Sequence, residues 1–330
     1  MSSILKARIN GTGYAVPEKI LTNTDLEKIV DTSDEWIRTR TGIEQRHIAE
    51  PHESNSDFGA TAAKIAIENA GLQPEEIGLI IVATITPDMV FPATACLIQE
   101  KLGLSNAGTV DIESACSGFI YGLSMARQYV ATGEYEHVLV IASELLSRIT
   151  DWEDRTTCVL FGDGAGAAVI SGTNEGESDI LATDLGGNGA FGNILYMPSG
   201  GSSKPACHET VDAREHTIRM NGQEVFKHAV NTMRSSVERT LEKAGVQPSE
   251  LKAVIPHQAN RRIIDSLRKY LDLPEQKVYV NVHNYGNTSA ASIAIALAEM
   301  IENGGLERGD LVALCAFGGG LTWGAALCRY

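Results

Sequence analysis

Short hydrophobic runs alternate along the chain with segments in which hydrophobic residues recur every three or four positions. The runs, which predict buried strands, lie at 77–85, 109–112, 137–143, 158–161, 166–171, 251–256, 311–317 and 324–329. The periodic segments, which predict helices, lie at 57–70, 92–102, 117–132, 222–244, 259–271 and 288–303. Residues 174–222 are rich in Gly, Ser and Thr and predict loops and short strands. The alternation of strands and helices predicts an α/β fold with mixed or mostly parallel sheets.

One segment of the chain recurs 174 residues later. The sequence AGLQPEEI at 70–77 returns as AGVQPSEL at 244–251, each time after a predicted helix and before a predicted strand. Gly71 and Gly245 occupy the same place in the two copies, where the end of a helix favours a residue that tolerates a positive φ. The repeat indicates a duplicated architecture.

A second pair of similar segments follows in the same order. FGDG at 161–164 is similar to FGGG at 317–320, and GAAV at 166–169 is similar to GAAL at 324–327. Two matched elements in one order predict two similar halves, which meet near residue 175.

The composition excludes several functional classes. The 330 residues include 42 Asp and Glu against 27 Lys and Arg, a formal net charge of −15, and 43% of them are hydrophobic. Such a chain can build a substantial core, and most of its surface repels phosphates, so we expect no nucleic-acid partner. The longest hydrophobic run, around 77–86, is about half of the roughly 20 residues that a membrane helix needs.

The N-terminal sequence and the cysteines indicate a reducing compartment. MSSILKARINGTGYAVP lacks the hydrophobic stretch of a signal peptide. The six cysteines are too sparse for a disulfide framework, and none stands in a CxxC motif or at zinc-ligand spacing from a histidine. We therefore expect a soluble cytoplasmic protein with no membrane contact and no metal.

Cys116 is the first candidate for chemistry. It stands in DIESACSG, between a short predicted strand and the start of a predicted helix. Backbone N–H groups and the macrodipole at a helix N-terminus lower the pKa of a thiol and favour the reactive thiolate. The small neighbours Ala115, Ser117 and Gly118 leave room for a substrate. A buried structural cysteine is the alternative, and this segment alone does not decide between the two.

His257 and Asn287 are the candidate partners. His257 ends a predicted strand in AVIPHQAN, and side chains at the carboxyl ends of strands commonly build the sites of α/β proteins. Asn287 stands in NYGNTSAAS, a loop that opens an alanine-rich helix. A hydrogen-bonded core imidazole and an ordinary helix cap are the alternatives. The repeat offset carries Cys116 to position 290, beside the Asn287 loop, so the duplication would bring the two loops face to face.

Six motifs together resemble the β-ketoacyl-acyl-carrier-protein synthase III family, and they span essentially the whole chain. They are DTSDEWIRTRTGI at 31–43, SACSG at 114–118, FGDGAG at 161–166, PHQAN at 256–260, YGNTSAAS at 285–292 and FGGGLTWG at 317–324. The resemblance implies the thiolase fold, with two duplicated five-stranded α/β halves layered αβαβα, and usually a homodimer. Residues 1–174 would carry the cysteine, and residues 175–330 the histidine and asparagine.

The resemblance also implies a reaction. An acyl group, commonly acetyl, passes from acyl-CoA to the Cys116 nucleophile and is condensed with malonyl-acyl carrier protein to begin fatty acid biosynthesis. His257 and Asn287 would donate hydrogen bonds to the enolate oxygen that malonyl decarboxylation creates. The backbone N–H groups of Cys116 and Gly319 would form the oxyanion hole. Acyl-CoA is a substrate in this reaction, and no cofactor is implied.

Three further sets of positions follow from the resemblance. The CoA contacts would be Thr32, Trp36, Arg40, Arg155, Asn260 and Arg262. The acyl pocket would be lined by Leu146, Phe161, Phe317 and Phe91, the last at a position that a partner subunit can contribute. The docking residues for the acidic carrier protein would be Lys227, Arg261, Arg262, Arg268 and Lys269, the last four on one broad face of a helix.

Three alternative functions can be compared with the sequence. A thiolase needs a second catalytic cysteine two residues before the glycine triplet, where Ala316 stands; Cys315, one position away, would point to the opposite face of its strand. A nucleotide-binding module built on GDGAG is disfavoured, because these glycines run into a predicted strand instead of a helix. A secondary-metabolism relative that uses the same three residues on another acyl primer remains open.

Overall fold

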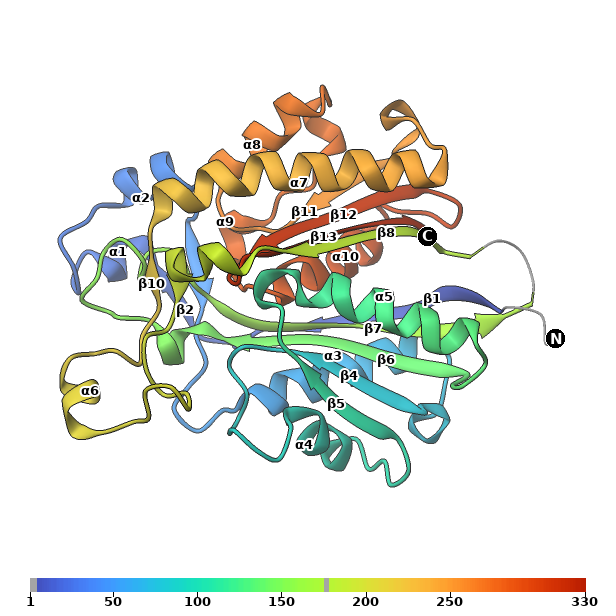
Figure 1. Ribbon diagram of the computed structural model, residues 1–330, viewed down its shortest axis with the longest axis horizontal. Coiled ribbons are helices and arrows are strands. Elements are labelled where there is room, and N and C mark those ends of the chain that lie inside the picture. Colours follow the sequence, from blue (N-terminus) through green and yellow to red (C-terminus); the bar gives the residue numbers. More distant parts are fainter. Residues whose placement is uncertain (1–4, 175–177) are drawn as a thin grey trace.

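The computed structural model describes residues 5–174 and 178–330, which form five stacked layers of helices and sheets (Figure 1). Each sheet is covered by helices on both faces, and hydrophobic residues from both sheets and from the helices between them share one core. This layering agrees with the αβαβα prediction. Within the described residues, no helix is both long enough and apolar enough to cross a lipid bilayer.

The first sheet has five strands in the order β1-β7-β6-β4-β5. Its strands are β1 (Lys6–Ala15), β4 (Leu79–Ala83), β5 (Gly108–Ile112), β6 (His137–Leu145) and β7 (Asp163–Thr173). β4 pairs in parallel with β5 and β6, whereas β7 is antiparallel to both β6 and β1.

The second sheet has four strands in the order β11-β12-β13-β8. Its strands are β8 (Ile180–Gly187), β11 (Ala253–Pro256), β12 (Leu311–Gly318) and β13 (Thr322–Arg329). β11 and β12 are parallel, and β13 is antiparallel to both β12 and β8. Two short ribbons lie outside these sheets: β2 (Ile20–Thr22) with β3 (Gln45–His47), and β9 (Leu195–Tyr196) with β10 (Arg219–Met220).

Six helices form the three helical layers (Figure 1). α3 (Asn55–Asn69) and α4 (Thr94–Lys101) cover the first sheet, α5 (Gly118–Ala131) and α10 (Ala291–Glu302) lie between the sheets, and α7 (Gly222–Ala244) and α8 (Arg261–Tyr270) cover the second sheet. The short α-helices are α1 (Asn23–Leu26), α2 (Asp34–Thr41), α6 (His208–Asp212) and α9 (Val282–Tyr285). The 3₁₀ segments are η1 (Pro74–Glu76), η2 (Ala115–Ser117), η3 (Leu146–Ile149), η4 (Gly189–Ile194), η5 (Pro248–Glu250) and η6 (Glu275–Lys277).

The two sheets share one plan. Strands β1-β7-β6-β4 and β8-β13-β12-β11 have the same succession of antiparallel, antiparallel and parallel pairs. In the first sheet, β5 is the edge strand beside β4. At the corresponding edge of the second sheet, beside β11, the described residues form only a single bridge, between Val254 and Val278. The expectation of two five-stranded halves is therefore wrong by one strand in the second half.

Backbone geometry supports the repeat. Gly71 and Gly245 both have a positive φ, 71° and 67°, at the ends of the helices that the repeat places before them. Ala115 and Ser289, also 174 residues apart, have the unusual values 43° and 49° just ahead of the central helices. The pairing of FGDG with FGGG is not structural, because Phe161 precedes β7 whereas Phe317 lies within β12.

Two differences from the strand predictions have a clear physical reason. β1 was not predicted, because Gly11 and Gly13 interrupt its hydrophobic pattern; a Cβ on Gly11 would lie 2.3 Å from the carbonyl oxygen of Ala66, so α3 can pack closely only on glycine. The run 158–161 is not a strand: it forms a turn, and Phe161 makes only an isolated bridge to Asn287. This run is hydrophobic because it lines a cavity.

The central helix α10 ties the halves together. It is buried along almost its whole length, and its Ala294 lies directly over Gly166 of β7 in the first sheet. The predicted boundary between residues 174 and 175 adjoins 175–177, which lie outside the described residues, and it stays a prediction.

Gly166→Ala is predicted to destabilise the fold. The new Cβ would lie 2.5 Å from the Cβ of Ala294 and 2.7 Å from α10 backbone atoms, so the helix must shift. We expect the free energy of unfolding, measured by chemical denaturation, to fall by about 1–3 kcal/mol.

Gly201→Ala is the matched control. A Cβ at Gly201 would meet no atom within 4 Å, so this change should alter the free energy of unfolding by less than about 0.5 kcal/mol. Equal effects of the two substitutions would show that the approach of α10 to β7 is not limiting.

Candidate active site

Cys116 lies where two cavities meet. It sits in η2, in the turn that leads into α5, and only 8% of it is exposed. One cavity, of about 300 Å³, is lined by Cys116, His257, Asn287 and Phe317 among others. The other, of about 540 Å³, is lined by Cys116, Leu146, Ser289 and Gly319 among others. The sulfur can therefore be approached from two sides.

The two symmetry-related helix starts face each other at this point. A Cβ on Gly118, in the first turn of α5, would lie 3.5 Å from the Cβ of Ala290, which caps α10. The loops of Cys116 and Asn287 are thus adjacent, as the repeat indicates.

The thiol of Cys116 is not a resting thiolate. Burial raises its pKa to about 12, although the hydroxyl of Ser289 and the backbone N–H of the cysteine lower it. The prediction that the helix start lowers this pKa is therefore wrong in its net effect, because desolvation of the charged form outweighs the local dipoles.

His257 follows the last residue of β11, with 3% of it exposed. Its backbone N–H donates to the carbonyl of Cys315 (2.7 Å), and its Nδ1 lies 2.7 Å from Oγ of Ser292. Ser292 Oγ accepts from the N–H of Gln258 (3.2 Å), which leaves its own hydrogen available to donate to Nδ1. This arrangement favours the tautomer with hydrogen on Nε2. Burial lowers the pKa of His257 to about 3, so the ring is neutral.

Asn287 is held by its backbone and by one side of its amide. Its N–H donates to the carbonyl of Leu160 (2.8 Å), and its carbonyl accepts from Gly162 (3.1 Å). Its Oδ1 accepts from the N–H of Ser289 (2.9 Å). With Oδ1 engaged, Nδ2 is the polar group that the side chain can offer as a donor to the cavity.

The glycine triplet lies against the cysteine backbone. A Cβ on Gly318 would lie 2.6 Å from the backbone nitrogen of Cys116, so only glycine allows this approach. The next residue, Gly319, lines the larger cavity beside Ala115 and Cys116.

Four of the six predicted CoA contacts line the smaller cavity: Trp36, Arg40, Asn260 and Arg262. The guanidinium of Arg155 lies 5.1 Å from the centre of the Trp36 ring, and that of Arg40 lies 5.6 Å from it. Thr32 is not among the lining residues. Five of the predicted positions therefore gather around one cavity mouth.

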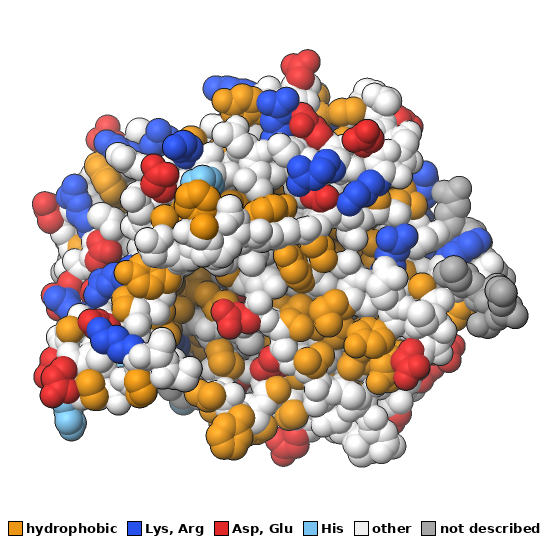
Figure 2. Space-filling model, viewed as in Figure 1, with side chains coloured by type: hydrophobic (Ala, Val, Ile, Leu, Met, Phe, Trp, Pro, Cys, Tyr) orange, Lys and Arg blue, Asp and Glu red, His pale blue; other side chains and the backbone are white. Residues whose placement is uncertain are grey.

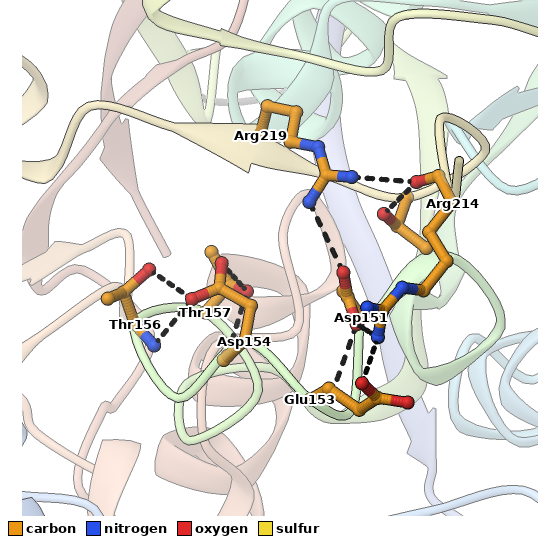
Figure 3. Close-up of polar contacts among 8 residues, drawn as sticks. Asp151, Glu153, Asp154, Thr156, Thr157, Arg214 and Arg219 are labelled. Atoms are coloured by element: carbon orange, nitrogen blue, oxygen red, sulfur yellow. Dashed lines mark hydrogen bonds and ion pairs between the residues drawn. The ribbon is translucent and has the colours of Figure 1, made fainter.

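The loop that carries Arg155 is anchored by a polar network that sequence reasoning missed (Figure 3). Asp151, 7% exposed, contacts Arg214 (3.4 Å) and Arg219 (3.2 Å). Asp154 accepts hydrogen bonds from the backbone and hydroxyl groups of the residues that follow Arg155. The network ties this side of the cavity mouth to the segment after α6, and no sequence motif marks it.

Three of the predicted acyl-pocket residues are distributed between the two cavities. Leu146 and Phe161 line the larger cavity, and Phe161 and Phe317 line the smaller one. Phe91 is 83% exposed and lines neither cavity of this chain, which is compatible with a position that a partner subunit contributes, and its role stays a prediction. Leu195, which lines both cavities, comes from the Gly-rich segment in which no site residue was predicted.

The four basic residues predicted to share one face of α8 lie on two different faces. Arg261 and Arg268 lie on one side, where Arg261 pairs with Asp265 (2.9 Å) and Glu275 (2.8 Å). Arg262 and Lys269 are exposed and lie about 100° further around the helix, the angle between successive residues.

The basic residue predicted on α7 also has an acidic neighbour. Lys227 lies 3.9 Å from Glu224, and Lys and Arg side chains alternate with Asp and Glu over this helix (Figure 2). Of the predicted docking residues on α8, Arg262 and Lys269 share the exposed face, and the docking role of the full set stays a prediction.

Comparison with known proteins identifies the family. The profile of 3-oxoacyl-[acyl-carrier-protein] synthase III matches residues 110–189, and the profile of its C-terminal part matches residues 241–330. The chain is 55% identical over 330 residues to the β-ketoacyl-[acyl-carrier-protein] synthase III of Caldanaerobacter subterraneus subsp. tengcongensis, which covers 100% of this chain and 99% of the relative.

Similar solved structures support the same family. The 3-oxoacyl-[acyl-carrier-protein] synthase III of Aquifex aeolicus is 51% identical, with a TM-score of 0.90 over 99% of this chain and 100% of that one. The priming β-ketosynthase of the R1128 polyketide pathway is 35% identical, with a TM-score of 0.92 over 99% of this chain and 97% of that one.

These similarities confirm the predicted fold class, enzyme class and family. The chain belongs to the β-ketoacyl-[acyl-carrier-protein] synthase III family of thiolase-fold condensing acyltransferases.

Proposed function

We propose that this protein begins fatty acid biosynthesis by transferring an acyl group from acyl-CoA to Cys116 and condensing it with malonyl-acyl carrier protein. The observation that carries the proposal is the meeting of Cys116, His257 and Asn287 in one buried cavity whose mouth is lined by Trp36 and Arg262. The full-length similarity to synthases of this name supports it. A secondary-metabolism role is less well supported, because the polyketide enzyme is the more distant relative.

In the first half-reaction, the Cys116 sulfur attacks the acyl thioester and CoA leaves. The tetrahedral intermediate carries a negative oxygen, which the backbone N–H groups of Cys116 and Gly319 would stabilise. The close approach of the glycine triplet to the cysteine backbone supports this assignment.

In the second half-reaction, loss of CO₂ from the malonyl group leaves an enolate. His257 and Asn287 would each donate one hydrogen bond to its oxygen, from Nε2 and Nδ2. The neutral ring of His257 and the engaged Oδ1 of Asn287 suit both groups to donating. The carbanion then attacks the acyl carbon on Cys116, and 3-oxoacyl-carrier protein is released. Decarboxylation supplies the electron pair, so this chemistry requires no cofactor.

Substrate binding would use the cavity mouth. The indole of Trp36 and the guanidinium of Arg155 can stack with an adenine, and Arg40 and Arg262 can bind phosphate. Thr32 and Asn260 would contribute polar contacts nearby; Asn260 already donates to the carbonyl of Arg40 (3.2 Å).

The larger cavity would hold the acyl group, against Leu146 and Phe161. We infer a homodimer, in which the exposed Phe91 would pack against a second copy. The need for a reduced Cys116 thiol supports a cytoplasmic location.

Cys116→Ala is predicted to abolish acyl-enzyme formation, because alanine has no nucleophile. Intact-protein mass spectrometry after incubation with acetyl-CoA should show the mass gain of one acetyl group on the wild type and none on the variant. Cys315→Ala, a substitution at a buried cysteine outside both cavities, is the control and should acylate normally. Acylation of the Cys116→Ala variant would remove the nucleophile assignment.

His257→Ala and Asn287→Ala are predicted to impair decarboxylation more than acylation. Loss of one oxyanion donor should slow release of CO₂ from malonyl-carrier protein by about 10²–10³-fold. Acylation of Cys116, followed by mass spectrometry, should slow far less. Equal losses in the two half-reactions would contradict the separate roles.

Lys269→Glu is predicted to weaken use of the carrier protein without affecting CoA. Lys269 is exposed on α8 outside the cavity lining, so the KM for malonyl-carrier protein should rise about two- to fivefold at low salt and less at high salt. Lys64→Glu, an exposed change on α3, is the control and should leave this KM unchanged. A changed KM for acetyl-CoA alone would contradict the docking role.

A further inference from the structure

A buried carboxylate behind Cys116 has no part in the reaction described above. Glu144 lies at the end of β6 and is completely buried. Its Oε2 accepts from the hydroxyl of Thr86 (2.7 Å), the N–H of Ile85 (3.1 Å) and the hydroxyl of Thr84 (3.3 Å). These bonds fix the loop after β4, so Oε2 has a structural role. The other oxygen, Oε1, is buried with no hydrogen-bond partner among the described residues.

Ser289 supplies a second buried polar atom at the same place. Its Oγ, too, has no well-aligned hydrogen bond within 5–174 and 178–330. The residue is 2% exposed and lines the larger cavity together with Cys116. Its φ of 49° is rare for serine, and its N–H is bound to Asn287 Oδ1, so the backbone holds the side chain in place.

The Ser289 hydroxyl is within reach of both the thiol and the carboxyl group. It lowers the pKa of Cys116 and that of Glu144, and the charge of Glu144 raises the pKa of Cys116. Glu144 contacts the hydroxyls of Thr84 and Thr86 and interacts with Ser289 and with the thiol of Cys116, and of these groups the thiol is the one that titrates. The thiol, the serine hydroxyl and the carboxyl group thus lie close together in one buried region, where Ser289 acts on both of the titratable groups.

The thiol needs a proton acceptor, and His257 is poorly arranged to be one. Its Nδ1 is hydrogen-bonded to Ser292, and this arrangement favours the tautomer whose Nε2 hydrogen the enolate requires. Burial also lowers its pKa to about 3, which disfavours the imidazolium. Burial instead raises the pKa of Glu144 to about 7, so this carboxyl group can exchange a proton near neutral pH.

We propose that Ser289 and Glu144 form a proton relay behind Cys116, in which the serine hydroxyl passes the thiol proton to the Glu144 carboxylate when the cysteine attacks the acyl thioester. The proposal rests on the function proposed above, because it assigns the fate of the cysteine proton in that reaction.

The proton balance closes over one cycle. In acylation, the S–H bond of Cys116 breaks, the proton moves through Ser289 Oγ to Glu144 Oε1, and the sulfur electron pair forms the new bond to the acyl carbon. The electron pair of the old C–S bond leaves on the CoA sulfur, which is protonated by water. In condensation, the carbanion displaces Cys116 as a thiolate, and the proton stored on Glu144 returns to it through Ser289.

Storing the proton has an electrostatic advantage. While Cys116 is acylated, Glu144 is neutral, so the enolate forms next to a carboxylic acid and not next to a carboxylate. A buried negative charge close to a developing anion would raise the barrier to its formation.

Glu144→Gln is the decisive variant. The full-length protein is assayed for alkylation of Cys116 by iodoacetamide and for single-turnover acylation by acetyl-CoA, from about pH 5.5 to 9. In the wild type, both rates should rise through an inflection near 7, because the acceptor is the ionised carboxylate. In the variant, this inflection should disappear and both rates should fall by about 10²-fold at neutral pH.

A purely electrostatic role of Glu144 predicts the opposite change in these rates. Removing the negative charge of Glu144 lowers the pKa of the Cys116 thiol, so the variant would then react faster. Rates in Glu144→Gln that equal or exceed those of the wild type would overturn the relay.

Ser289→Ala and Ser289→Gly distinguish the role of the Ser289 hydroxyl from that of the backbone conformation at this position. Both remove Oγ, but glycine accepts a φ of 49° without strain and alanine does not. The relay predicts that both variants slow by a similar factor, whereas a role in backbone geometry alone predicts that glycine stays close to the wild type. Near-wild-type rates in Ser289→Gly would overturn the relay. Thermal unfolding identifies any variant that fails to fold.

The two proposals fail in different ways. Iodoacetamide requires no acyl-CoA, so an intact pH inflection without acyl-enzyme formation would contradict the proposed function. Normal acyl-enzyme formation in Glu144→Gln would contradict the relay and leave the proposed function in place.

Discussion

The burial of two helix starts between two sheets is the constraint on which the rest of this structure depends. α5 and α10 begin at the same point of the central layer, and the approach of α10 to β7 requires glycine at position 166. This packing places Cys116 opposite the Asn287 loop and leaves His257, at the end of β11, to complete the cavity. One packing arrangement thus brings together residues from both halves of the chain.

The same burial sets the charges in the site. Desolvation raises the pKa of Cys116 and Glu144 and lowers that of His257, so a thiol, a neutral imidazole and a carboxyl group with a pKa raised to about 7 coexist within one buried region. A neutral donor at His257 and a proton acceptor at Glu144 divide the acid–base work between two groups. This division explains why a carboxyl group can be retained next to a site that stabilises anions.

Much of this protein could be predicted where the signal is local. The helix predicted at 222–244 has these ends in the structure, where Asn221 caps its start and Gly245 ends it with a positive φ. The site motifs were recognised because each is a short run with fixed spacing. β1 was missed for the opposite reason: its glycines serve the packing of α3, which lies 50 residues and more along the chain. The network around Asp151 joins residues about 60 apart and has no motif.

By itself, the sequence determined the duplicated α/β plan and the family, and it marked as candidates the cysteine, histidine and asparagine that line one cavity. These depend on periodicity, spacing and residue type, which can be read along the chain. The tertiary structure alone decided the protonation of the site, the division of the α8 charges into two faces, the exposure of Phe91 and the place of Glu144 behind Cys116. The physical reason is that desolvation and ion pairing depend on neighbours brought together by folding, many of them more than 100 residues apart in sequence.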